Sequence, residues 1–318
     1  MARTRSVSRS RGRLCTPIDG IQPRSKSKSK SKQILKSAPP PWQLVFLLLL
    51  VWAICMSSVS RIETSSNIIS QEDPSTPLQI LRLMMAAFIL GLQVFEIKYR
   101  DTVEKIGYLE GSKLVTANVP INGIKCLVFF THWNWVLLGI YFLLAGCGVN
   151  NIFVLFLWEL AAPNAFLVSA IVTWVLWPAE LSNKRPDTKG YRRYDAICMH
   201  VTNAAFVLIE MLWAKTAINL DHWGLIPLFG CIYQLFAWWL APRLQPKTGP
   251  VYMYFFLDTT FGWRFSCVSL LALLAVLVLF FFVAVGLTSA LDKFDYYPLY
   301  QRAIVLALFW KVIVKYKD

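Results

Sequence analysis

The chain has 318 residues, of which 56% are hydrophobic, 14% aromatic and 16% charged. Soluble domains carry about 25% charged residues, so this deficit of charge excludes an ordinary soluble fold. The apolar residues come in long blocks and do not alternate, which predicts an all-α, polytopic transmembrane helical bundle and disfavours a β-barrel. The formal net charge of +14 does not indicate a nucleic-acid partner, because a basic tail and the loops supply it.

Residues 1–41 are rich in Ser and basic residues, with 11 Lys and Arg against one acid. A segment of this composition cannot bury a core, so we expect a disordered tail that orients the first span and contacts anionic lipid. The first span, Trp42–Ser60, follows this basic segment and ends in small residues. It is either a signal anchor or a signal peptide cleaved after Ser60.

Six more apolar stretches reach the roughly 20 residues that a bilayer core requires, and they define a membrane domain over 78–290. They are Leu78–Ile97, Leu127–Gly146, Ile152–Trp177, Ala196–Ala214, Trp223–Ala241 and Phe265–Ala290. The sequence thus predicts about seven spans. Residues 303–314 in the C-terminal tail 291–318 are apolar but few, and basic residues flank them. We interpret them as an interfacial helix, with an eighth span as the alternative.

The loops between these spans carry charge unequally. Thirteen basic residues fall in the first set of loops, 98–126, 178–195 and 242–264. Only two fall in the second set, 61–77, 147–151 and 215–222. This asymmetry predicts that the first set is cytosolic, as is the N-terminus unless it is cleaved. The protein is therefore expected in an endomembrane or the plasma membrane, and the sequence does not say which. It also leaves the oligomeric state open.

Polar residues within the spans are the candidates for function. The span from Ala196 carries His200, Asn203 and Glu210 on one third of the helix circumference. Such a stripe cannot face lipid, so it either binds other helices or lines a functional site. Thr131 and His200 each lie four to five residues inside the cytosolic end of a span, ~6–7 Å deep. A hydroxyl and an imidazole at one depth could act as nucleophile and base.

Several residues could complete or compete with this pair. Asn134 or Asn203 could stabilise an oxyanion, and Asp195 or Asp258 could orient the histidine. His132 is a rival base. Thr131 could instead bond the carbonyl four residues earlier, as threonine commonly does in membrane helices.

Toward the outer side, Arg82 is expected to pair with Glu159 or Glu210, which would lower the cost of burying these charges. The same three residues could form part of a proton or ion path.

The chain contains no GxGxxG, GxxxxGK[ST], HExxH or GxSxG motif, and its seven cysteines lack metal-site spacing. We therefore expect no cofactor and no metal.

The segments FFTHWNWVLLGIYFLL, MHVTNAAFVLIE and GPVYMYFFLDTTFGW resemble the rolling-stone-like and androgen-induced-protein superfamily of multi-span membrane proteins, over about 78–290. For the androgen-induced branch the resemblance implies intramembrane hydrolysis of fatty-acid esters of hydroxy fatty acids, with Thr131 and His200 in the roles of threonine and histidine. The rolling-stone branch, to which the chain looks closer, is linked to myoblast fusion and has no established chemistry. The sequence therefore predicts a lipid ester hydrolase or a non-catalytic protein of adhesion, fusion or scaffold type, and less strongly a proton-coupled transporter. Its partners are membrane lipids and, for the enzyme, a lipid ester substrate.

Overall fold

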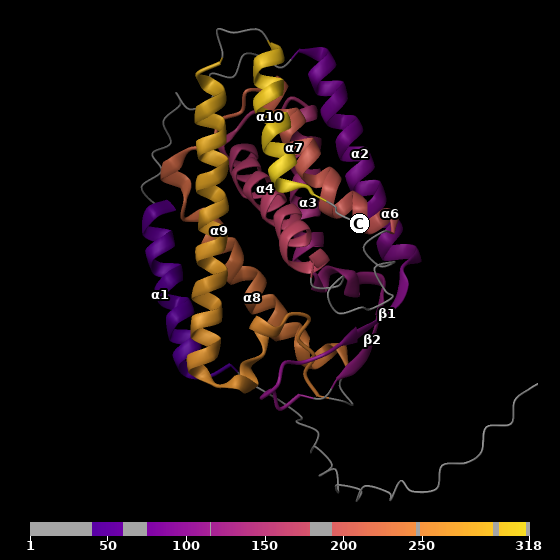
Figure 1. Ribbon diagram of the computed structural model, residues 1–318, viewed down its shortest axis with the longest axis vertical. Helices are drawn as coiled ribbons and strands as arrows, with labels where there is room; N and C mark the ends of the chain where they lie inside the picture. The colour runs from indigo at the N-terminus through magenta and orange to yellow at the C-terminus, as the bar shows by residue number, and fades with distance from the viewer. Residues whose placement is uncertain are drawn as a thin grey trace, which may run out of the picture. The chain divides into compact units, whose positions relative to one another are not determined.

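The computed structural model describes residues 40–59, 75–114, 116–178, 193–245, 249–294 and 299–315, within the unit Ile34–Asp318. The predicted tail over 1–41 lies outside the described residues except for its last two. The described part is a helical bundle (Figure 1).

Six helices of the described chain are long and apolar enough to cross a membrane. Two of them contain a short π-helical segment, a form with one extra residue per turn. These six are α1 (Trp42–Val59), α2 (Thr76–Tyr99), α4 (Ile152–Ile171) with the π-helix η2 (Val172–Leu176), α6 (Tyr194–Ile197) with the π-helix η3 (Cys198–Thr202) and α7 (Asn203–Trp213), η4 (Leu220–His222) with α8 (Leu225–Leu244), and α9 (Trp263–Asp292). They confirm the predicted all-α, multi-pass architecture.

The remaining predicted span is shorter than the sequence indicated. Helix α3 (Phe130–Gly146) has 17 residues, because the 3₁₀ helix η1 (Gly123–Val128) precedes it. At 1.5 Å per residue it is ~25 Å long. It packs between α2 and α4, and its side chains Trp135, Leu138 and Phe142 are fully buried. Helix α3 is therefore a central element of the bundle.

Helix α10 (Leu299–Ile313) lies lengthwise along α7 and α4 (Figure 1). The Arg302 guanidinium donates to the Met211 carbonyl (2.8 Å), near the end of α7. The Trp174 indole, in η2, donates to the Val312 carbonyl (2.9 Å). Arg302 and Val312 are ten residues apart, so these contacts hold ~15 Å of α10 lengthwise against the bundle, as an eighth span would lie. With 15 residues, α10 is nevertheless shorter than a typical span.

A β-hairpin follows α2, in a loop for which the sequence predicted no regular structure. Strands β1 (Asp101–Ile106) and β2 (Ala117–Asn122) pair antiparallel, with Asp101 opposite Asn122. Alternate residues of β2 are buried and pack against Leu244 and Val251. We call this end of the bundle, where α2 and α8 end and α9 begins, the hairpin end.

The hairpin is fixed to the segment before α9, which contains η5 (Phe255–Leu257) and η6 (Thr259–Phe261). The Ser112 hydroxyl donates to Asp258 (2.5 Å), and the Tyr252 amide donates to the Tyr108 hydroxyl (3.2 Å). Burial raises the pKa of Tyr108 to about 12, so this hydroxyl is protonated at physiological pH. The hairpin is thus a folded cap on one end of the bundle.

Helix α1 packs against α8 and α9, burying Leu44, Leu48 and Cys55. The approach is close at Gly224, where an added Cβ would lie 2.8 Å from the Cys55 carbonyl oxygen. Only glycine permits backbones this near each other. The first span therefore packs along the outside of the bundle, with these three side chains buried and its others exposed or half-buried.

Candidate functional site

Two buried asparagines tie the middle of the bundle together. With the Asn134 amide oriented so that its oxygen meets donors and its nitrogen meets an acceptor, the Asn203 side-chain amide donates to the Asn134 oxygen (2.8 Å). The same oxygen accepts from the Ala165 backbone amide (3.2 Å). The Asn134 nitrogen donates to the Ala161 carbonyl (3.1 Å). Pro163 lies within that turn of α4, where a proline weakens the helical hydrogen-bond ladder and leaves polar groups to satisfy. The asparagines thus join α3, α4 and α7.

These bonds give both asparagines a packing role. One N–H of each amide is engaged, and both side chains are fully buried. An oxyanion role for Asn134 or Asn203 would require a rearrangement or a second N–H directed at substrate, and it stays a prediction.

Thr131 lies one turn nearer the hairpin end, in the first turn of α3, and is half-buried. Its hydroxyl makes no hydrogen bond within the described part of the chain. By contrast, Thr202 donates to the Cys198 carbonyl and Thr288 to the Ala284 carbonyl (3.2 Å). The bond to the carbonyl four residues earlier, expected as the alternative role, is therefore absent at Thr131.

His200 occupies the centre of the π-helical segment η3 and is half-buried. Its imidazole bonds to the backbone of Ala196, and its own carbonyl accepts from the Ser169 hydroxyl (2.5 Å). π-helical turns are rare and occur frequently at functional sites. His200 therefore lies in the kind of backbone setting in which functional residues are often found, and its role as a base stays a prediction.

The rival base, His132, has both ring nitrogens occupied. Nδ1 lies 2.9 Å from the Gln93 side-chain oxygen, and Nε2 lies 3.4 Å from an Arg100 nitrogen. Because arginine only donates, Nε2 accepts and Nδ1 carries the hydrogen. With both ring nitrogens engaged, His132 has a structural role that joins α3 to Gln93 and Arg100.

The two candidate aspartates differ in position. Asp258 is fully buried and accepts from Ser112 and from the Thr260 amide (2.8 Å), within the hairpin cap. Asp195 bonds to Arg193 (3.0 Å) and interacts electrostatically with His200. Asp195 is therefore the better placed of the two to orient His200, and the role of Asp258 stays a prediction.

At the opposite end of the bundle, a buried ion pair joins α2 to α7. The Arg82 guanidinium donates to Glu210 through Nη2 (2.6 Å) and Nε (2.9 Å), and Arg82 is only 3% exposed. The Tyr141 hydroxyl also donates to Glu210 (2.6 Å). This confirms one of the two pairings predicted for Arg82.

Glu159 has a different partner from the one that the sequence suggested. His222 Nδ1 lies 2.6 Å from a Glu159 carboxylate oxygen, and the backbone N–H of Asn219 donates to the same carboxylate (2.8 Å). Glu159 and His222 are both buried. The sequence signal for His222 was weak, because a histidine beside a tryptophan at a span boundary is also typical of an aromatic belt.

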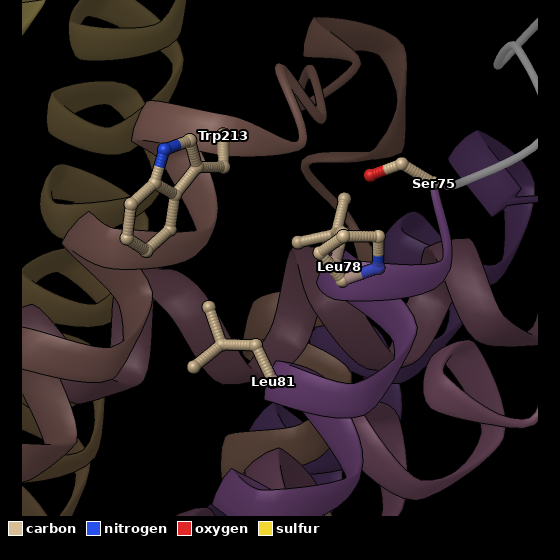
Figure 2. Close-up of a pocket in the computed structure, with 5 residues that line it drawn as sticks. Ser75, Leu78, Leu81 and Trp213 are labelled. Atoms are coloured by element: carbon tan, nitrogen blue, oxygen red, sulfur yellow. The ribbon is translucent and has the colours of Figure 1, made fainter.

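A pocket of about 400 Å³ opens between the start of α2 and the end of α7. Figure 2 shows Trp213 facing Leu78 and Leu81 across it, with Ser75 at its rim. None of the predicted catalytic residues lines this pocket. It therefore does not belong to the candidate site at the hairpin end.

Comparison with protein-family models, with curated proteins and with solved structures finds no match for this chain.

Proposed function

We propose that this multi-pass membrane protein hydrolyses long-chain lipid esters within the membrane, with Thr131 as nucleophile and His200 as general base. The observation that carries the proposal is the Thr131 hydroxyl, which is half-buried and bonded to no group of the described chain. The resemblance to the androgen-induced branch assigns the same two residues.

The asparagine pair supports this assignment. Thr131 and His200 each lie three residues before an asparagine, and the two asparagines are bonded to each other. Helix α3 and the segment η3 also pack side by side. Thr131 and His200 are thus borne on helices that are fixed to each other, as the positioning of a nucleophile and a base requires.

The chemistry would follow the general scheme of acyl transfer. The Thr131 oxygen attacks the ester carbonyl carbon while His200 takes the hydroxyl proton. The alcohol leaves with that proton, and His200 then activates a water that releases the acid from Thr131. Stabilisation of the oxyanion would fall to the second N–H of the Asn134 or Asn203 side chain. The backbone N–H groups of Phe130 and His132 at the start of α3 already donate to the Tyr254 hydroxyl (3.3 Å) and the Phe129 carbonyl (3.1 Å).

The surroundings of Thr131 suit a lipid substrate. Phe130 and Trp133, its neighbours on α3, contact aromatic side chains of α8, with 5.6 Å between the ring centroids of Phe130 and Phe229 and 4.9 Å between those of Trp133 and Phe236. Trp133 and Phe236 are half-buried, so this seam between α3 and α8 extends to the lipid-facing side. An acyl chain could therefore approach Thr131 laterally through it.

The test is ester turnover by the purified protein in lipid nanodiscs, together with labelling by a lipid-like fluorophosphonate. Thr131→Ala and His200→Ala should each abolish turnover, and the double variant should be no worse than either. Thr202→Ala is the matched control, because its hydroxyl bonds within its own helix. Full turnover in Thr131→Ala would refute the assignment.

The second candidate is a non-catalytic protein of adhesion, fusion or scaffold type. The engaged buried groups Asn134, Asn203, Arg82 and Glu210 favour it, because they join helices to one another. The absence of fluorophosphonate labelling in a folded sample would support this candidate. A transporter is less favoured, because Arg82 and Glu159 belong to separate pairs and not to one path.

A further inference from the structure

Three helix termini at the hairpin end each carry an exposed cation beside an exposed aromatic ring. We call them the basic–aromatic collar: Lys98 with Tyr99 at the end of α2, Arg243 with Trp239 at the end of α8, and Arg264 with Trp263 at the start of α9. The cations lie 5.1, 4.3 and 5.5 Å from the respective ring centroids. The Tyr99, Trp239 and Trp263 rings are 60%, 56% and 46% exposed.

The collar cations have no anionic partner in the described part of the chain. Lys98, Arg243 and Arg264 form no ion pair there, whereas Arg82, Arg100 and Arg193 each bind a carboxylate. Stacking on an aromatic face holds a cation without neutralising its charge. The collar therefore presents localised positive charge that is available to an external anion.

The exposed surface next to the collar is apolar. Phe95 on α2 and Val268 on α9 lie about one turn from Lys98 and Arg264, and Leu235 on α8 lies about one turn from Trp239; all three are exposed. A ligand of the collar must therefore match cations on one side and a hydrocarbon-like surface on the other. A phospholipid with an anionic headgroup meets both conditions, and a nucleic acid or an acidic peptide meets only the first.

We propose that the basic–aromatic collar binds the headgroups of anionic phospholipids, with the acyl chains along the faces of α2, α8 and α9. The charge asymmetry of the loops assigns this end to the cytosolic leaflet, where such lipids are concentrated. At the other end, the exposed cation Lys293 stacks on no ring within the described residues. Binding is thus expected at one end only.

The experiment uses the full chain in phosphatidylcholine nanodiscs with a small fraction of photoactivatable phosphatidylserine. The basic tail also attracts anionic lipid, so the readout is the crosslinked peptide identified by mass spectrometry. We expect crosslinks within residues 235–268 from the phosphatidylserine probe, and far fewer from a phosphatidylcholine probe. Soluble glycerophosphoserine should not compete, since the acyl chains contribute to binding.

Arg243→Gln/Arg264→Gln is the test variant, and Lys215→Gln/Lys293→Gln removes equal charge at the other end. At sub-saturating lipid, the first should lower the crosslink yield in 235–268 by about 30-fold, because each basic residue contributes about fivefold to the binding of anionic lipid and two are removed. The second should leave the yield unchanged. Trp239→Leu/Trp263→Leu, which keeps both charges, should give an intermediate loss.

Equal crosslinking by both probes, or an unchanged yield in Arg243→Gln/Arg264→Gln, would overturn the proposal. Each variant is first checked for an unaltered unfolding temperature in detergent. If the double variant does not fold, the single variants Arg243→Gln and Arg264→Gln replace it, each with an expected loss of about fivefold.

Discussion

Replacing Glu210 by Gln tests the most consequential buried contact in the bundle. The change preserves the size of the side chain but removes the charge that faces the Arg82 guanidinium. Arginine cannot release its proton in a protein, so Arg82 would stay charged and buried without a counter-ion. Two Arg82 nitrogens and the Tyr141 hydroxyl now converge on this carboxylate.

Two reference magnitudes bracket the loss of stability. Removing one partner of a buried ion pair costs about 3–5 kcal/mol, whereas neutral polar contacts between membrane helices contribute about 0.6 kcal/mol on average. Gln retains an oxygen that can accept from Arg82, which places the expected loss near the lower limit of the first range. We therefore expect Glu210→Gln to lower the free energy of unfolding by about 3 kcal/mol.

Equilibrium unfolding in mixed micelles with increasing SDS measures this loss. Arg82→Met should restore part of the stability in the Glu210→Gln background, with a coupling free energy of about 2 kcal/mol. Glu104→Gln is the control, because its side chain is 41% exposed and its loss should change stability by less than about 0.5 kcal/mol. If the Arg82 and Glu210 substitutions add independently, the two side chains do not form the buried pair.

Three further outcomes are expected. Asn134→Leu should destabilise the protein by about 1–3 kcal/mol, and adding Asn203→Leu should recover part of that loss, because no polar partner is then left unpaired; additive losses in SDS unfolding would contradict the bond. Intact-mass measurement of the membrane-extracted protein should show the first span retained, since α1 packs against α8 and α9, and a mass that corresponds to a chain starting after Ser60 would disprove retention. Asp258→Ala should increase hydrogen exchange in the hairpin selectively by removing the acceptor of Ser112, and unchanged exchange would show that this bond does not hold the cap.

Hydropathy predicted the long helices well because a bilayer sets both their length and their composition. It did not predict the hairpin, although residues 117–122 alternate apolar and polar side chains, as half-buried strands do. That alternation covers only six residues. It lies in a loop whose basic residues were used to assign it to one side of the membrane, and charge does not indicate whether a loop forms strands. The start of α3 was misjudged by a few residues, because η1 is equally apolar but winds as a 3₁₀ helix.

The buried pairs show which contacts sequence can and cannot predict. Arg82 and Glu210 lie at matching depth on long helices, so position along each helix was enough to suggest the pair. Glu159 pairs with His222, which belongs to a short turn, and the path of a turn cannot be derived from helical periodicity. Likewise, a shared depth suggested Thr131 with His200, but only the arrangement of the helices shows that Asn134 meets Asn203.

Because the Asn134–Asn203 bond fixes α3 against α7, the directions in which the Thr131 and His200 side chains point around their helices decide whether the two can act together. Because α3 and α7 run in the same direction, Thr131 and His200 both lie one turn nearer the hairpin end than the bonded pair. On a regular α-helix three residues turn the side chain by 300°, so both groups would rotate equally away from the Asn134–Asn203 contact. The π-helical segment η3 changes that rotation for His200 alone, since it adds a residue to the turn between His200 and Asn203. The direction of the imidazole, and with it any reaction at Thr131, therefore depends on η3 keeping its π-helical form.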